Sequence, residues 1–210
     1  MSREKIIRRV AKPAVFVLCL GPVFWFAWLA VSGGLGANPI EATNRYFGDW
    51  GLRFLLVALA VTPLREMLGL SVVARFRRMI GLYTFFYIFL HLTSYVALDQ
   101  FFDLAAIWSD IVKRNFITVG MISFAMLVPL AVTSTKGWMK RLGGKVWQRL
   151  HRLVYAAGIL GVVHFYMMVK ADVREPLIYA AVLGALLAWR IFRRIKRKAA
   201  GRRNAHPANS

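Results

Sequence analysis

Three of the four histidines lie inside long apolar stretches, where an ionisable side chain is costly and usually marks a functional site. His91 belongs to the segment 77–95 (RRMIGLYTFFYIFLHLTSY), while His151 and His164 belong to the segment 147–166 (WQRLHRLVYAAGILGVVHFY). Any one of them could instead be a buried histidine that hydrogen-bonds a neighbouring carbonyl. Three on two stretches point to shared chemistry, because imidazole nitrogens move protons and bind metal ions.

The composition around these histidines favours metal binding over proton transfer. A proton relay in a membrane usually combines histidine with Asp or Glu, and the apolar stretches hold almost no carboxylates. The single cysteine, Cys19, excludes an internal disulfide, a cysteine-rich metal cluster and the C-x-x-C-H motif of covalent haem attachment. The group that needs only imidazole ligands and a large apolar slot is a non-covalently bound haem.

The elements that must position the histidines are membrane-spanning helices. The 210 residues are 59% apolar with a mean hydropathy of +0.53, whereas soluble domains are about 45–50% apolar. Most of the apolar stretches approach the roughly 20 residues that a helix needs to cross a bilayer, and a helix satisfies its own backbone groups in lipid. The sequence therefore predicts an all-α, polytopic membrane protein with a bundle of six transmembrane helices, at residues 13–31, 52–64, 79–98, 116–133, 150–169 and 176–192.

The basic residues indicate the orientation of the chain rather than a nucleic-acid partner. The net charge is +20, but the 29 Lys and Arg residues fall between the apolar stretches instead of along one face. One set of connecting segments holds 23 of them and the opposite set holds six. The positive-inside rule then places both termini in the cytoplasm. No nucleic acid is expected as a partner, and the basic tail from about residue 194 is expected to lie against anionic membrane lipid.

The expected depths of the histidines pair two of them. The third and fifth helices both run outward, and His91 and His164 lie roughly 18 and 21 Å from their inner ends at about 1.5 Å per residue. They are expected to bind one haem iron from opposite sides in the outer half of the bilayer. His151 lies roughly 20 Å lower, near the cytoplasmic edge. It is expected to serve a separate site, which would hold a second haem or act as an electron entry point. It shares a face with His164 only if the helix is distorted near Gly158 and Gly161.

The outer segment 99–115 is predicted to form an interfacial helix. Asp103 and Asp110 would face away from its apolar side and could offer polar groups to a soluble partner. A connecting loop with a membrane-anchoring tryptophan is an equal alternative. The apolar residues that recur at helical spacing are Phe101, Leu104, Trp108 and Ile111.

The motifs around the histidines resemble the ferric-reductase-like transmembrane domain. They are the third-helix His91, the W-x-x-L-H-R-L-x-Y motif at 147–155 followed by a second histidine, His164, and PLAVTS at 129–134. The resemblance covers essentially the whole chain, so residues 1–210 are interpreted as a single domain. The chain has 210 residues and no recognisable dehydrogenase domain, and in this it resembles the bacterial haem-binding membrane subunits of the family.

The resemblance implies a role in electron transfer. Such members are inner-membrane cytochromes b that pass electrons to MsrP, a periplasmic molybdopterin enzyme that reduces methionine sulfoxide in oxidised proteins. This chain would then be the non-catalytic subunit of a heterodimer with MsrP, and its electrons would come from quinol or a cytosolic flavin reductase. The implied cofactors are one or two haem b groups, with FMN as a further candidate. The histidines that match the family are His91, His151 and His164.

Three arginines at the inner edge are candidate cofactor ligands. The wider family has a fourth histidine where this chain has Arg77 and Arg78, so a standard two-haem stack is not the direct expectation. Arg77, Arg78 and Arg152 could bind haem propionates or a flavin phosphate. For each arginine taken singly, the alternative is a positive anchor on the cytoplasmic side of the membrane, which the positive-inside rule favours.

Two other functions compete with this interpretation. A small transporter with a histidine-lined pathway would be favoured by half-helices and inverted repeats, and neither is evident in the sequence. A reductase could also act directly on ferric iron or oxygen at the periplasmic face. No residue resembles a catalytic nucleophile or general base, so the catalytic conversion is expected to belong to the partner.

Overall fold

Helices make up the whole of the regular structure in the part of the chain that the computed structural model describes, residues 3–69, 71–169 and 171–204. The predicted all-α class is therefore confirmed. The short helices include two π-helices (η1 and η3) and one 3₁₀-helix (η2). In chain order, the elements are α1 (Arg3–Ile6), η1 (Ile7–Ala11), α2 (Lys12–Val31), α3 (Pro39–Leu68), η2 (Ser71–Arg75), α4 (Arg77–Ser94), η3 (Tyr95–Asp99), α5 (Leu104–Lys113), α6 (Asn115–Val132), α7 (Lys136–Leu150), α8 (Leu153–Met168) and α9 (Arg174–Asn204).

The number of membrane spans is five or six. Within the described residues, five helical stretches are long and apolar enough to cross a bilayer. A sixth is obtained if α7 and α8, which meet at a bend of 43°, count as one broken span. Gly143 interrupts α7 with φ 72°, a left-handed backbone that glycine adopts at little cost. The predicted multi-pass membrane protein is confirmed, whereas the count of six depends on how this bent pair is assigned.

Helix α3 is much longer than the predicted span 52–64. It begins at Pro39, where the side chain of Asn38 caps the helix by accepting a hydrogen bond from the Glu41 N–H at 3.2 Å. The first half of α3 contains charged residues that dilute its hydropathy, so the apolar run alone underestimates its length. This half of α3 turns out to line the cavity described below.

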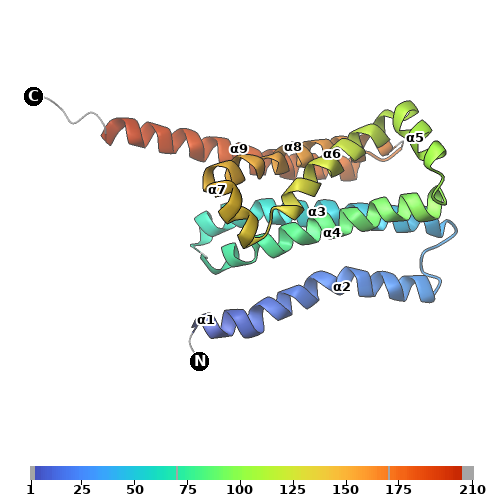
Figure 1. Cartoon of the computed structure of the whole chain (residues 1–210), viewed down its shortest axis with the longest axis horizontal. Helices are drawn as coiled ribbons and strands as arrows, with labels where there is room; N and C mark the ends of the chain where they lie inside the picture. The colour runs from blue at the N-terminus through green and yellow to red at the C-terminus, as the bar shows by residue number, and fades with distance from the viewer. Residues whose placement is uncertain (1–2, 70, 170, 205–210) are drawn as a thin grey trace, which may run out of the picture.

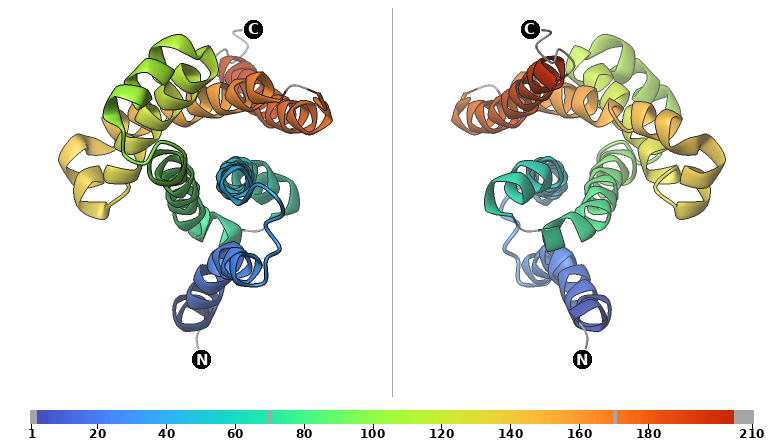
Figure 2. Two further views of the ribbon diagram at one scale, coloured as in Figure 1. Left: turned by 90° about the vertical axis from the view of Figure 1, so that its right-hand side faces the viewer. Right: turned by 90° about the vertical axis from the view of Figure 1, so that its left-hand side faces the viewer.

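The helices are arranged as two close pairs and a covering helix. Helix α3 packs along α4 and α6 packs along α8, while α9 covers α8 and α3. Figure 2 shows this arrangement along the bundle, with α2 lying apart to one side. The main apolar core joins α3, α6, α8 and α9. Its most buried residues include Leu55, Leu59, Leu127, Ala157, Phe165 and Leu183.

Helix α2 is attached to α3 and α4 by tyrosine hydroxyl groups. Three of them donate hydrogen bonds to backbone carbonyls that lie three residues apart along α2. The surrounding aromatic cluster also buries the lone thiol of Cys19. Because the rest of α2 is largely exposed, these bonds fix its position against the bundle. They join Tyr83 to Phe16 (2.9 Å), Tyr87 to Cys19 (2.7 Å) and Tyr46 to Pro22 (2.7 Å).

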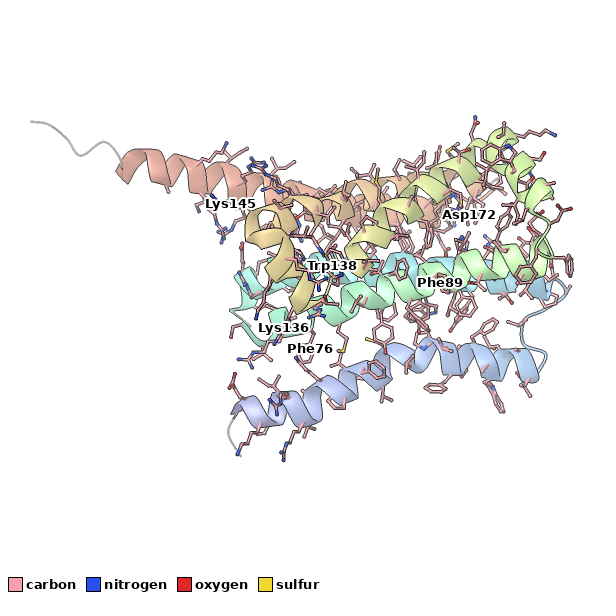
Figure 3. The ribbon with its side chains drawn as sticks, in the orientation of Figure 1. Phe76, Phe89, Lys136, Trp138, Lys145 and Asp172 are labelled. Atoms are coloured by element: carbon pink, nitrogen blue, oxygen red, sulfur yellow. The ribbon has the colours of Figure 1, made fainter. Side chains whose placement is uncertain are left out.

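The two ends of the bundle differ in charge. Helix α1 and the C-terminal part of α9 lie at the same end of the molecule, which we call the inner end (Figure 1). Figure 3 shows Lys136 and Lys145 of α7 toward this end, and Asp172 toward the opposite, outer end. At the inner end, Arg193 and Arg197 of α9 each pair with Glu66 at 2.8 Å. A chain with both ends on one side is what the predicted topology requires.

The outer segment contains the predicted helix, α5. Its exposed apolar row consists of Leu104, Trp108 and Val112, rather than a row that includes Ile111. Asp103 caps α5 by accepting hydrogen bonds from two backbone N–H groups. Asp110 is largely buried and internally bonded, as described below. Asp110 is therefore engaged within the protein, whereas Asp103 remains exposed at the start of α5. The expectation that these carboxylates face a soluble partner remains a prediction.

Candidate functional site

His91 and His164 lie next to each other in the bundle. His91 is near the outer end of α4 and His164 is near the outer end of α8. Their ring centres are 6.1 Å apart and the ring planes are inclined by 73°. The arrangement agrees with the matched depths predicted from the sequence.

Each of these rings is held by one backbone carbonyl. The Nδ1 atom of His91 lies 2.9 Å from the carbonyl oxygen of Asn44 on α3, and Nδ1 of His164 lies 2.6 Å from that of Phe116 on α6. A carbonyl oxygen can only accept, so Nδ1 carries the proton in both rings. The Nε2 atoms are then left with a free lone pair. A histidine that binds a metal is typically oriented in this way through its other nitrogen.

A glycine faces each ring, one helical turn after the carbonyl that holds it. A Cβ atom added at Gly48 would lie 3.1 Å from Nδ1 of His91, and one added at Gly120 would lie 2.8 Å from Nδ1 of His164. Any larger residue at position 120 would therefore push the ring away from its carbonyl. The same arrangement of carbonyl, glycine and histidine occurs between α3 and α4 and again between α6 and α8. We call the two sets the histidine clamps: Asn44, Gly48 and His91 form one, and Phe116, Gly120 and His164 form the other.

The clamps contain residues that the sequence did not single out. Backbone carbonyls have no signature in the sequence, so Asn44 and Phe116 could not have been singled out. A weak signal does exist in the spacing, since His91 follows Gly48 by 43 residues and His164 follows Gly120 by 44. Such a repeat becomes meaningful only when the packing of the helices is known.

The separation of the two rings suits opposed ligation of one metal ion. Imidazole nitrogens bind metals at about 2.0–2.1 Å, so two opposed rings on one ion have centres roughly 6 Å apart. The measured 6.1 Å is close to this value. In the described part of the chain, no cluster of three or more His, Cys, Asp and Glu side chains could hold a bare metal ion. A metal carried by its own macrocycle, which needs only two protein ligands, fits this donor set.

Both histidines line a cavity of about 910 Å³ between the two helix pairs. This volume lies within the range of about 300–1,000 Å³ that is common for ligand and cofactor sites. The wall around the rings is apolar, and the outer rim is polar. Apolar wall residues include Leu52, Ile88, Met121, Phe124, Phe165 and Met168. Charged rim residues include Arg45, Asp49, Asp99, Arg114 and Asp172.

His151 does not join the other two histidines. It lies in the turn between α7 and α8, where its ring stacks on Trp147 at 3.9 Å between ring centres. Its Nε2 atom is 3.1 Å from the hydroxyl oxygen of Thr133. His151 is not part of the cavity wall. The expectation of a separate inner site for His151 therefore remains a prediction.

The chain bends at His151 rather than at the glycines of α8. Helix α8 runs without interruption through Gly158 and Gly161. Gly158 packs against Leu55, because an added Cβ there would lie 3.1 Å from the leucine side chain. Gly161 lines the cavity and leaves room beside the apolar wall. Of the two glycines, one therefore serves helix packing and the other shapes the cavity.

None of the three arginines expected to bind a cofactor lines the main cavity. Arg77 instead borders a small cavity of about 70 Å³ between α3, η2 and α4. Arg78 and Arg152 are exposed near the inner end. The arginines that do line the main cavity are Arg45 and Arg114, among the residues that the structure describes. Any role of the inner arginines belongs to a different site.

The paired histidines and the apolar cavity lie in a chain that matches a known family of membrane proteins. The family described as "Ferric reductase like transmembrane component" matches residues 47–162. This range contains four of the six clamp residues and leaves out Asn44 and His164. The resemblance seen in the histidine motifs is thereby confirmed.

Curated relatives specify the family further. The chain is 58% identical to a protein of Rhodospirillum rubrum over 92% of this chain and 93% of that relative. It is 53% identical to one of Caulobacter vibrioides over 85% of each, and 46% identical to one of Xanthomonas campestris over 99% and 98%. Each is named "Protein-methionine-sulfoxide reductase heme-binding subunit MsrQ". The chain belongs to the MsrQ family of ferric-reductase-like membrane proteins.

Proposed function

We propose that this chain is a membrane cytochrome b that delivers electrons to a periplasmic methionine sulfoxide reductase. The observation that carries the proposal is the pair of imidazoles at 6.1 Å in one apolar cavity, each fixed through Nδ1. The names of the relatives, which describe heme-binding subunits of such a reductase, support the same function.

In this proposal, His91 and His164 are the residues that would hold one haem b, with their Nε2 atoms as the available donors. When bound, the haem supplies the one-electron redox chemistry. The chain's own contribution is to fix the two rings through Asn44 and Phe116 and to exclude water with an apolar wall. A second haem or FMN would need its own site near His151 at the inner end.

This function also requires an electron acceptor, an electron donor and a defined orientation in the membrane. The electron acceptor is MsrP, which carries out the reduction of methionine sulfoxide, so this chain itself does not convert the substrate. The donor is quinol or a cytosolic flavin reductase on the inner side. The chain acts as one domain in the bacterial inner membrane, with its basic tail from about residue 194 in the cytoplasm.

Electron delivery can be tested with the purified protein in lipid nanodiscs. After anaerobic reduction by a quinol analogue, the haem is expected to be reoxidised rapidly only when MsrP and methionine sulfoxide are both added. Fast reoxidation by ferric citrate or oxygen alone, at the rate reached with MsrP, would support direct reduction instead. Failure of MsrP and methionine sulfoxide to reoxidise the haem would contradict the proposed partner.

The orientation can be tested separately through the C-terminus. Because 23 of the 29 basic residues lie in the inner segments, a C-terminal alkaline phosphatase fusion is expected to be inactive and a green fluorescent protein fusion to be bright. A phosphatase fusion placed after residue 102, in the outer segment, serves as the control and should be active. The reverse pattern would overturn the orientation.

A further inference from the structure

Two arginines stand beside the two histidine clamps at the outer end of the cavity. Arg45 directly follows Asn44, whose carbonyl holds His91, and Arg114 lies two residues before Phe116, whose carbonyl holds His164. Both arginines line the same cavity as the histidines. Each half of the site therefore presents one imidazole and, on its outer side, one guanidinium.

Both guanidinium groups have a carboxylate partner one helical turn earlier. Arg45 pairs with Glu41 at 3.6 Å, and Arg114 pairs with Asp110 at 3.1 Å. A guanidinium has five N–H donors, so one carboxylate partner leaves donors for a second anion. Both arginine side chains remain about half exposed at the cavity mouth.

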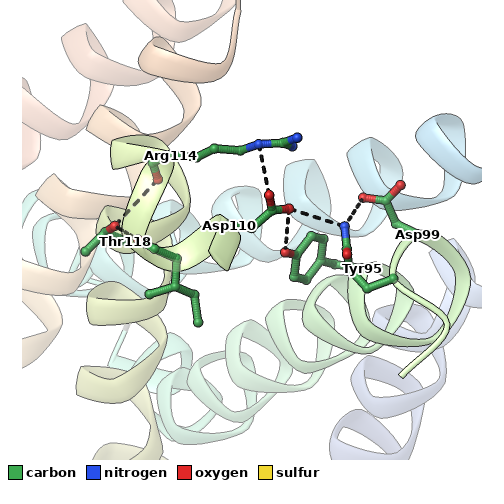
Figure 4. A network of polar contacts seen from close by, with 7 residues as sticks. Tyr95, Asp99, Asp110, Arg114 and Thr118 are labelled. Carbon is green, nitrogen blue, oxygen red and sulfur yellow. Dashed lines mark hydrogen bonds and ion pairs between the residues drawn. The ribbon is translucent and has the colours of Figure 1, made fainter. Parts of the chain in front are cut away.

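The pairing of Arg114 is reinforced by a polar network, shown in Figure 4. The hydroxyl of Tyr95 and the amide of Gln100 both donate to the second oxygen of Asp110, at 3.1 and 3.3 Å. Tyr95 begins the π-helix η3, one turn after His91. The network thus links the helix that bears His91 to the arginine beside the other clamp.

We propose that Arg45 and Arg114 bind the two carboxylates of the cofactor, the propionates in the case of haem. The inference rests on the proposed haem-binding function and adds the residues that hold the carboxylate edge. Arginine forms short, charge-assisted and often bidentate bonds with carboxylates. The cavity also has four acidic rim residues, Glu41, Asp49, Asp99 and Asp172. These acids repel a dicarboxylate, whereas Arg45 and Arg114 are the cationic side chains among the described residues that line the cavity, so they can attract its two arms.

The proposal moves the carboxylate-binding site to the opposite end from the sequence-based expectation. Arg77, Arg78 and Arg152 lie at the inner end and outside this cavity. Arg45 and Arg114 lie beside the loops of the outer end, which faces the periplasm in the proposed orientation. The carboxylate edge of the cofactor would then face the side on which the soluble acceptor docks.

The test compares the neutral variants Arg45→Met and Arg114→Met with the matched control Lys113→Met. Lys113 is next to Arg114 in the chain but does not line the cavity, and its replacement by Met removes the same charge. Loss of haem to excess apomyoglobin is expected to become roughly tenfold faster in each arginine variant, the size expected for one charged hydrogen bond. The control should match the wild type. The low-spin spectrum should persist in all three proteins, because both His91 and His164 remain.

Two further measurements separate carboxylate binding from a structural effect. The midpoint potential of the haem should fall in both arginine variants, because removal of a positive charge favours the ferric form. Haem whose propionates are methyl esters should leave the wild type and both variants at the same rate. Should Arg114→Met fail to fold, Arg45→Met supplies the same comparison independently.

The outcomes distinguish this inference from the proposed function. If the wild type binds low-spin haem but the arginine variants keep its loss rate and potential, the carboxylate site is elsewhere. Faster loss in Arg77→Met alone would place it at the inner end. If the wild type binds no haem at all, the proposed function itself fails.

Discussion

His91→Ala and His164→Ala are each expected to abolish the low-spin spectrum of the bound haem. In either variant only one imidazole remains in the cavity, so the haem becomes high-spin or is lost during purification. The loss should exceed the roughly 10–100-fold weakening that follows removal of a group that merely orients a metal ligand. Absorption spectra and haem content of the purified proteins give the result directly.

His151→Ala is the matched control for this prediction. His151 bonds to Thr133 and stacks on Trp147, away from the cavity. The low-spin haem held by His91 and His164 should therefore persist in the His151 variant. Full retention of the low-spin signal in both His91→Ala and His164→Ala would rule out the axial pair.

Gly120→Ala is expected to displace His164 and to weaken haem binding by about 10–100-fold, as when an orienting contact is lost. The added Cβ would lie 2.8 Å from Nδ1, closer than such atoms normally approach. The ring must then move away from the carbonyl of Phe116. Gly48→Ala should have a smaller effect of the same kind, since its Cβ would lie 3.1 Å from His91.

Gly81→Ala, on the helix that carries His91, is the matched control and is not expected to weaken haem binding. An added Cβ at this position has no neighbour within 4 Å. Alanine is favoured over glycine in a helix interior by roughly 0.5–1 kcal/mol, so this variant should be as stable as the wild type or slightly more stable. Haem content and thermal unfolding in detergent would be measured for all three variants. Equal haem retention in Gly120→Ala and Gly81→Ala would contradict the clamp.

The sequence was sufficient to predict which histidines come together. Helical rise fixes depth, and equal depth on two outward-running helices predicted the meeting of His91 and His164. The same rise separated His151 from them. The all-α class followed from the apolar runs, because lipid leaves the backbone few alternatives to helices. These predictions depended on periodic properties that a single sequence contains.

The remainder of the site depends on packing that the sequence does not display. The carbonyls of Asn44 and Phe116 act through backbone atoms, and Gly48 and Gly120 act through the absence of a side chain. The first half of α3 did not show as an apolar run in the sequence, since Glu41, Arg45 and Asp49 line the cavity instead of facing lipid. The sequence also favoured basic residues at the inner end as carboxylate ligands, although charge there reflects the topology of the chain. It did not indicate Arg45.

The most direct test is the spectrum and haem content of the wild-type protein, purified from membranes in mild detergent. We expect about one low-spin haem b per chain in the cavity of His91 and His164, by pyridine haemochrome assay and electron paramagnetic resonance. An inner site at His151 would add a second haem that disappears in His151→Ala and leaves the first unchanged. A protein that contains no haem, or only high-spin haem, would contradict the account.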